Sequence, residues 1–418
     1  MTSQTDETID SDVVIIGAGI VGICVAALLA EQGRSVTVID RTGICEETSS
    51  GNAGALAFSD VLPLAHKGMM KNLPKWLSDP LGPLTISPRY LPALMPWLWR
   101  FWRAGMADPR PAIAAQAGLM KLAETEWMGL LDRSGARSML REDGSLELYE
   151  SEGEFRASLP GWAERERFGI GYRHVAGEEM TALQPGLSPQ FVKGTFVPGW
   201  KTVSDPKLLG KAIWRYAEGL GARFVKGEAI AMAATADGAL VSMLGLPAVR
   251  GRTLVIAAGA WSHLLAARFG DRIPLDTERG YNTTLPVDAF DVKRQLIFSG
   301  HGFVITPLET GLRIGGAVEF AGLKRAPNFA RSKAMLEKAQ RFLPGLKTKG
   351  GREWMGYRPS MPDSLPVIGR GNAPNLIYAF GHGHLGLTQA AATGRLVAQL
   401  VDGAAPAIDL TPFSFRRF

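Results

Sequence analysis

The chain has 418 residues, which suits two hydrophobic cores better than one. Hydrophobic residues make up 46% and charged residues 21%, as in soluble globular proteins, so a disordered or solenoid chain is not favoured. The net charge of +6 comes from scattered lysines and arginines, whereas nucleic-acid binding needs a concentrated basic patch.

The cysteine content and the N-terminal residues indicate the cellular compartment in which the protein is expected. Cys24 and Cys45 are the only cysteines, so neither a disulfide framework nor a cysteine metal cluster is expected, and a reducing compartment is indicated. Met1–Asp10 lacks the basic start and apolar run of a signal peptide. No apolar run reaches the roughly 18–20 residues that span a bilayer. We therefore expect a cytoplasmic protein, either free or attached peripherally to the inner face of the plasma membrane.

The first elements predict a βαβ unit. Asp12–Ile16 reads as a buried strand, Ile23–Gln32 as a helix stopped by Gly33, and Ser35–Ile39 as a second strand. Between the first strand and the helix, the glycines permit a tight turn, close approach of a pyrophosphate, and close helix–strand packing. The predicted dinucleotide-binding residues are Gly17, Gly19, Ile20, Val21, Gly22, Asp40 and Arg41.

Asp40 ends the second strand, 18 residues after Gly22. A carboxylate at this place binds a ribose hydroxyl and would repel the additional phosphate of NADP.

The segment Leu62–Pro111 is rich in proline and tryptophan and breaks the periodicity, so a domain change is expected there. Within it, Tyr90–Arg103 combines three tryptophans, apolar residues and two arginines, which suits a membrane interface. The alternative is that these tryptophans pack inside the protein. Pro92 and Pro96 are expected to interrupt any helix.

Further elements alternate along the rest of the chain. Residues 272–320 alternate in the manner of strands, and the other predicted elements are helices Pro111–Leu131, Pro206–Glu218, Arg331–Phe342 and Leu387–Val401 and strands Ser145–Tyr149, Ala222–Lys226, Thr253–Ala257 and Leu376–Phe380. This order predicts an α/β (α+β) fold with two interleaved domains. A Rossmann-like domain would combine residues 1–60, 195–265 and 350–418, and a mixed-sheet substrate domain would combine 61–194 and 266–349.

Two small-residue segments are candidates for contact with a nucleotide or a flat cofactor. Glu47–Gly54 mixes hydroxyl and amide residues with glycine, and the alternative is an ordinary polar loop. Ala257–Ser262 ends a buried strand, and the alternative is a plain strand-to-helix turn. The predicted binding residues in these segments are Ser49, Asn52, Ala53, Gly54, Gly259 and Trp261.

Two later motifs carry charge or helix-terminal amides. Arg358 precedes Pro359, which favours an extended backbone, and an arginine fork binds a carboxylate bidentately. The alternative is a surface arginine. Phe380–Thr388 follows a buried strand and opens a helix, so its glycine-rich backbone offers a second anion or carbonyl-oxygen site. His382 and His384 have no third metal ligand near in sequence, so no metal is expected.

In this order the motifs resemble the D-amino-acid oxidase superfamily, and most of all the bacterial FAD-dependent D-amino-acid dehydrogenases. The resemblance covers essentially the whole chain, and the residues that carry it are Gly17–Gly22, Ser49–Gly54, Ala258–Trp261, Arg279–Tyr281, Gly356–Pro359 and Gly381–Gly386. It implies that Arg358 grips a substrate carboxylate and that Tyr281 lines the substrate pocket. It also implies that a glycine-rich segment lies against the flavin, formed by Gly381, Gly383, His384, Leu385, Gly386, Leu387 and Thr388. Covalent members use a late cysteine, and none follows Cys45, so FAD is expected to be non-covalent.

The resemblance implies oxidation of the C–N bond of a small D-amino acid by hydride transfer to flavin N5, with Arg358, Tyr281 and His384 in the catalytic site. The product would be an imine that hydrolyses to a 2-oxo acid. His384 resembles members that act on cyclic substrates such as D-hydroxyproline or D-proline. The alternatives are glycine, sarcosine or opine oxidation, or a non-catalytic FAD-binding subunit. A quinone or electron-transfer chain is the expected acceptor.

Overall fold

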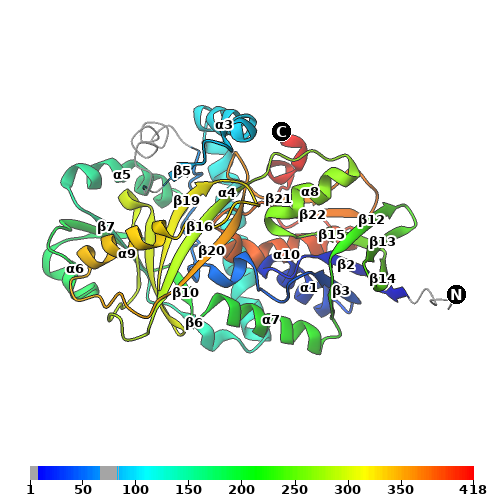
Figure 1. Ribbon diagram of the computed structural model, residues 1–418, viewed down its shortest axis with the longest axis horizontal. Coiled ribbons are helices and arrows are strands. Elements are labelled where there is room, and N and C mark those ends of the chain that lie inside the picture. The colour runs from blue at the N-terminus through cyan, green and yellow to red at the C-terminus, as the bar shows by residue number, and fades with distance from the viewer. Residues whose placement is uncertain (1–7, 66–81, 83) are drawn as a thin grey trace.

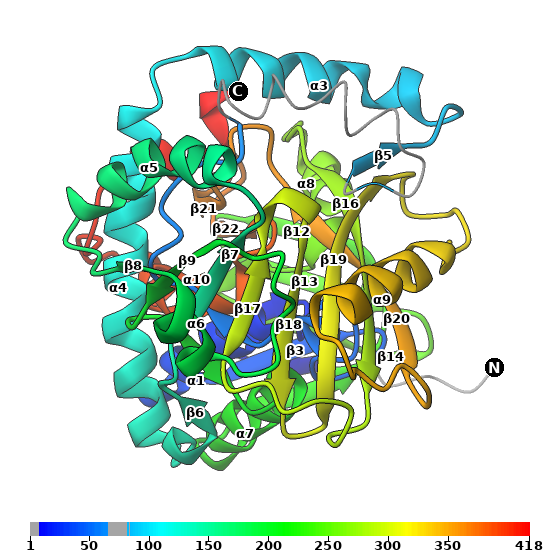
Figure 2. The ribbon, with the colours of Figure 1, turned by 90° about the vertical axis from the view of Figure 1, so that its left-hand side faces the viewer.

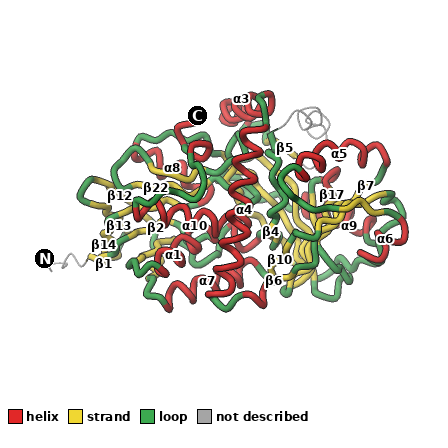
Figure 3. The backbone as a smooth tube through the Cα atoms, turned by 180° about the vertical axis from the view of Figure 1, so that it is seen from behind, coloured by secondary structure: helices red, strands yellow, loops and turns green. Residues whose placement is uncertain are grey.

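The computed structural model describes residues 8–65, 82 and 84–418. Two halves lie side by side, each built on its own sheet, with the N-terminus at the outer end of one half (Figure 1). The long helix α4 (Arg110–Arg133) runs along the back of the molecule between them (Figure 3).

The first half is built on a six-stranded sheet in which only the edge strand β21 is antiparallel. Its four central strands consist almost wholly of buried residues, because the sheet is covered on both faces. In spatial order the strands are β11 (Arg223–Lys226), β3 (Val36–Asp40), β2 (Val13–Ile16), β15 (Thr253–Ile256), β22 (Leu376–Phe380) and β21 (Val367–Arg370).

Helices and a second sheet cover the two faces. One face packs against α4 and against α1 (Ile20–Glu31), α7 (Pro206–Gly219) and α10 (Gly386–Asp402). The other face packs against α8 (Ser262–Ala266) and a small sheet of β1 (Thr8–Asp10), β14 (Leu246–Gly251), β13 (Gly238–Met243) and β12 (Ala229–Thr235). Helix α7 starts sharply because the Asp205 side chain accepts hydrogen bonds from the Lys207 and Leu208 amides and Pro206 opens the first turn.

The second half is built on a nine-stranded, mostly antiparallel sheet, seen face-on in Figure 2. In spatial order its strands are β20 (Arg352–Ser360), β16 (Asp276–Leu285), β19 (Gly311–Phe320), β18 (Phe303–Leu308), β17 (Gln295–Phe298), β7 (Ser145–Tyr149), β9 (Lys193–Val197) and β8 (Arg173–Val175), and β5 (Leu84–Ile86) pairs with β19. Helices α6 (Gly177–Leu183) and α9 (Ala330–Phe342) pack their apolar residues on one face. The opposite face lines a cavity.

The remaining elements connect and cap the halves. A three-stranded sheet joins β4 (Ala55–Leu56), β10 (Lys201–Val203) and β6 (Leu140–Arg141). Helix α5 (Glu152–Glu166) begins with a Ser151 cap, and α3 (Leu91–Met106) lies across the top of the molecule (Figure 2).

The α/β fold class and the predicted elements outside the tryptophan-rich segment are confirmed, with small shifts at their ends. The expectation that prolines interrupt a helix at Tyr90–Arg103 is wrong. Pro92 occupies the first turn, where no amide donor is needed. Pro96 lies inside the helix, and the burial of Leu94 and Trp97 offsets the lost hydrogen bond.

The division into domains stays a proposal. β20 pairs with β16 in the larger sheet, so we place the last boundary after Ser360 rather than near residue 350. The domain change expected within Leu62–Pro111 falls partly outside the described residues.

Candidate functional site

A cavity of 1390 Å³ lies between the two halves, within the described part of the chain. It is bounded on one side by the carboxyl ends of the parallel strands and on the other by the larger sheet. Typical small-molecule pockets have about 300–1,000 Å³. The volume therefore suits a dinucleotide together with a second small molecule.

The predicted glycine loop joins β2 to α1 at one end of this cavity. Gly17 has φ +115°, and a Cβ there would lie 2.3 Å from the Ala257 carbonyl oxygen. A Cβ on Gly22 would lie 2.0 Å from the Gly17 oxygen, so Gly22 packs behind the loop and does not line the cavity. Gly19 precedes α1 without a side-chain cap of its own, and the Ile20 amide donates to the Ser49 hydroxyl at 3.0 Å, so the amides after Ile20 are the ones available to an anion.

Asp40 holds this loop as well as facing the cavity. Its Oδ2 accepts the Ala18 amide at 2.8 Å, and its Oδ1 accepts the amides of Thr42 and Gly43. A carboxylate oxygen accepts about two hydrogen bonds, so Oδ2 keeps a place for a ribose hydroxyl. Arg41 lies 4.2 Å above the ring of Trp261, and both line the cavity.

The loop after residue 47 is fixed to the larger sheet. The Asn282 side-chain amide donates to the Gly51 oxygen at 2.9 Å, and Arg313 donates to the Asn52 oxygen at 2.5 Å. A Cβ on Gly51 would lie 2.3 Å from the ring of Trp354. These contacts hold Ser49, Asn52 and Ala53 on the cavity wall, and their binding of a cofactor stays a prediction.

Arg313 and Gly54 differ from what the sequence motifs predict. Arg313 belongs to no motif, and only the pairing of β19 beside the loop brings it to the cavity, where burial lowers its pKa to about 10. Gly54 was predicted to bind the cofactor. It does not line the cavity, because it packs against Leu308 and Val203.

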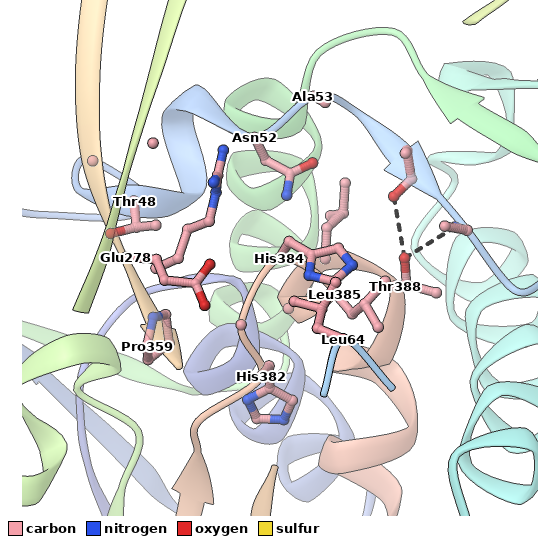
Figure 4. A pocket seen from close by; sticks show the side chains of 18 of the residues that line it. Thr48, Asn52, Ala53, Leu64, Glu278, Pro359, His382, His384, Leu385 and Thr388 are labelled. Carbon is pink, nitrogen blue, oxygen red and sulfur yellow. Dashed lines mark hydrogen bonds between the residues drawn. The ribbon is translucent and has the colours of Figure 1, made fainter. Parts of the chain in front are cut away.

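The glycine-rich segment after β22 brings the start of α10 to the cavity. Gly383, His384, Leu385, Gly386, Leu387 and Thr388 line it, whereas Gly381 packs against Met361. The Thr388 hydroxyl accepts the Ala57 amide at 3.0 Å and donates to the Ala55 oxygen (Figure 4). No side chain caps α10, so its first amides are available to an electron-rich ring edge.

The two histidines have separate partners. His382 is buried, its Nε2 lies 2.9 Å from the Thr393 hydroxyl, and burial lowers its pKa to about 3, so it stays neutral near pH 7. His384 Nε2 lies 3.2 Å from Oδ2 of Asp60. Among the described residues no group of three or more potential metal ligands is found.

Arg358 is half-buried in the cavity wall and is not a fully exposed surface arginine. Its Nη1 donates to the Ala317 oxygen at 3.0 Å, which places the guanidinium over β19. Burial lowers its pKa, although the charge of Glu278 on the neighbouring strand opposes that effect. Glu278 also lines the cavity, and Figure 4 shows it across the cavity from His384. Sequence reasoning missed Glu278, since it lies in no motif.

Tyr281 is among the residues that line the cavity, and its hydroxyl has partners on the other side of the sheet. Its hydroxyl donates to Glu319 at 2.5 Å and accepts the Asn328 amide, and its ring packs in the core behind the sheet. Gly280 and Asn282 line the cavity on either side of it. Tyr281 therefore stays a predicted pocket residue, with a hydroxyl that is already hydrogen-bonded within the protein.

With this geometry in place, the chain can be compared with known proteins. The family described as DAO, FAD dependent oxidoreductase, matches residues 12–400. The chain belongs to this family. This FAD-dependent oxidoreductase is 36% identical to a D-amino-acid oxidase of Bradyrhizobium diazoefficiens, over 97% of this chain and 98% of that protein. It is 30% identical to a D-amino acid dehydrogenase of Sinorhizobium medicae, over 97% and 99% of the two chains.

Solved structures support the fold. A glycine oxidase from Geobacillus kaustophilus aligns with a TM-score of 0.75 at 23% identity, covering 98% of this chain and all of that one. An L-proline dehydrogenase from P. horikoshii aligns with a TM-score of 0.76 at 20% identity, covering 99% and 98%. At this identity the likeness establishes the architecture alone.

The residues fit FAD, the cofactor of the family. Gly17–Val21 and Asp40 would hold the adenosine diphosphate half, and Ser49–Ala53 and His384–Thr388 would hold the flavin half. The N-terminus of α10, and that of α1 after Ile20, would present amides toward electron-rich groups. Bound FAD supplies an acceptor for two electrons and a proton in the form of hydride.

We expect purified protein to be yellow and to release FAD into the supernatant on acid precipitation. The only cysteines, Cys24 and Cys45, are both buried, and burial raises the pKa of both thiols, so neither is suited to form a covalent link. The measurement is the distribution of flavin absorbance between supernatant and pellet. Colour retained by the washed pellet would contradict a non-covalent cofactor.

Proposed function

We propose that this oxidoreductase oxidises the C–N bond of D-amino acids, with Arg358 binding the substrate carboxylate. The observation that carries the proposal is the half-buried Arg358, which lines the cavity and forms no ion pair with any described residue. A charge that is partly removed from water is stabilised when a group of opposite charge binds to it. A substrate carboxylate would provide that partner in a bidentate contact.

The surrounding residues suit this reaction. Gly280, Gly315 and Gly316 line the cavity near the arginine, so a substrate can approach the sheet closely. Glu278 is buried, its Oε1 accepts the Ser360 hydroxyl at 2.6 Å, and it lies beside Arg358, where it would attract the substrate amino group. The role of these groups is to bind and orient Cα. The imine formed would be hydrolysed by water to a 2-oxo acid and ammonia, whereas a cyclic imine could persist.

A panel of substrates tests the proposal. We expect turnover of D-amino acids to exceed that of the L-enantiomers, glycine, sarcosine and opines. D-proline and D-hydroxyproline belong in the panel because the cyclic preference rests on His384 alone, which is hydrogen-bonded to Asp60. Turnover of glycine or sarcosine above every D-amino acid would contradict the proposal. Failure of all substrates would favour a non-catalytic FAD-binding subunit.

The proposed acceptor is a quinone at an anionic membrane surface, and α3 supports this choice. Its outer face exposes apolar residues spaced three or four apart, namely Leu91, Met95, Trp99, Trp102 and Met106. Residues 89–107 contain three arginines and no acidic residue. Its inner face, with Trp97 and Phe101, lines the cavity. Among the described helices none is long and apolar enough to cross a bilayer.

We expect the double substitution Trp99→Ser with Trp102→Ser to weaken binding to phosphatidylglycerol vesicles by about tenfold or more. Each indole is 53% exposed and would bury apolar surface in the lipid interface. Co-sedimentation with vesicles measures the effect, and Leu244→Ser is the matched control because Leu244 is 84% exposed on a distant turn. Equal sedimentation of wild type and double variant would exclude α3 as the contact. Reoxidation by oxygen as fast as by a soluble quinone would exclude the quinone.

A further inference from the structure

The sheet that carries Arg358 also brings a second charged group to the cavity, Glu147 of β7. It lines the cavity, and its only hydrogen bond with a described residue comes from the Ser299 hydroxyl, 2.6 Å from Oε1. It forms no ion pair with the described residues. Burial raises the pKa of Glu147, because the Ser299 hydrogen bond and the charge of Arg165 offset only part of the cost.

Arg165, the cation near Glu147, is paired with another carboxylate. Arg165 lies 3.5 Å from Asp60, donates to the Ser59 oxygen, and stacks 4.7 Å above the ring of Trp162. His384 is the second partner of Asp60. Because Arg165 and His384 both contact Asp60, Glu147 is left without an ion pair among the described residues.

Strand pairing gives the separation of Glu147 from Arg358. The Arg358 guanidinium lies over β19 at Gly316 and Ala317. Gly316 pairs with Phe303 on β18, and Phe303 pairs with Phe298 on β17. The residue before Phe298 pairs with Glu147 on β7. Three strand spacings of about 4.8 Å make roughly 14 Å.

The floor between the two charged groups is apolar. Gly315 pairs with Val304, Val304 with Ile297, and Ile297 with Glu147, and all four line the cavity. The wall therefore presents a cation, an aliphatic surface and then an anion. With contacts of about 3 Å at each end, a ligand would span about 8 Å between its own charges. An extended lysine spans roughly 7 Å from carboxylate carbon to ammonium nitrogen.

We propose that Glu147 selects D-amino acids with a cationic side chain of the length of lysine or arginine. This inference rests on the proposed oxidation of D-amino acids, with Arg358 at the carboxylate. The aliphatic stem would lie on Ile297 and Val304, and the terminal ammonium or guanidinium would contact the Glu147 carboxylate.

The test compares charged substrates with neutral ones of similar shape. We expect wild-type kcat/KM for D-lysine to exceed that for D-norleucine, and D-arginine to exceed D-citrulline. In Glu147→Gln each ratio is expected to fall about tenfold or more, because a charge-assisted contact is lost, while kcat/KM for D-norleucine changes little. Glu147→Asp should retain the cationic preference, and Glu152→Gln, on the surface of α5, should match wild type.

The outcomes separate this inference from the function on which it rests. Oxidation of neutral D-amino acids without a wild-type preference for D-lysine or D-arginine would overturn the role of Glu147 and leave the proposed function intact. A preference that survives unchanged in Glu147→Gln would do the same. If no D-amino acid reduces the flavin, both the function and the inference are wrong.

Discussion

Replacing Arg358 with methionine is expected to lower kcat/KM for D-amino acids by roughly a hundredfold or more while FAD stays bound. A bidentate, charge-assisted contact with a carboxylate is worth about 3 kcal/mol in a buried site. Methionine keeps much of the side-chain volume, so the wall beside Gly280 remains filled. The measurement is steady-state kinetics together with the ratio of flavin to protein.

A control on the same strand makes the result specific. Arg352→Met removes an exposed arginine from β20 that does not line the cavity, so its kcat/KM should match wild type. Arg358→Lys should recover part of the activity, because a single point charge replaces the fork. If Arg358→Met turned over substrate as well as Arg352→Met, the carboxylate would have to bind elsewhere.

Gly19→Val is expected to produce a folded protein that has lost at least nine-tenths of its FAD. Gly19 has φ −70°, which any residue adopts, and a Cβ there would lie 3.3 Å from the Ser49 hydroxyl oxygen. The backbone therefore tolerates the side chain. A valine would nevertheless occupy the space in which the pyrophosphate approaches the start of α1.

The control for Gly19→Val is Gly33→Ala, just after the same helix. Gly33 has φ +76°, and a Cβ there would meet no atom within 4 Å, so the substitution costs about 1–2 kcal/mol of backbone strain and nothing at the cofactor. Thermal melting and flavin content separate the two effects. Full flavin content in Gly19→Val would place the pyrophosphate away from this loop.

Local pattern was enough to predict the dinucleotide half of the site. The loop at Gly17–Gly22 is formed by consecutive residues, because a strand, a turn and a helix follow one another without a long connection. The start of α10 is similar, since a buried strand and a run of glycines predict a helix terminus on a cavity. Gly54 and Gly381 show the limit of that reasoning, because each packs against neighbouring residues beside the cavity and does not line it.

The substrate half depends on pairings between distant strands. Glu278, Arg313 and Glu147 line the same cavity only because β16, β19 and β7 belong to one sheet. The partners of the Tyr281 hydroxyl could not be predicted, because they depend on the pairing register of the strand, which the sequence does not give. For α3, the two prolines led to the prediction that no continuous helix forms. In the structure the helix is continuous, because burial of Leu94 and Trp97 stabilises it.

Anaerobic reduction of the bound flavin is the most direct measurement of the central claim. Enzyme and a single D-amino acid, D-lysine or D-norleucine, are mixed without oxygen or any other acceptor, and the visible flavin absorbance is followed. We predict full bleaching by the D-enantiomer and little by the L-enantiomer, and much slower bleaching in Arg358→Met. Equal bleaching by both enantiomers, or no bleaching by any D-amino acid, would contradict oxidation of D-amino acids at this site.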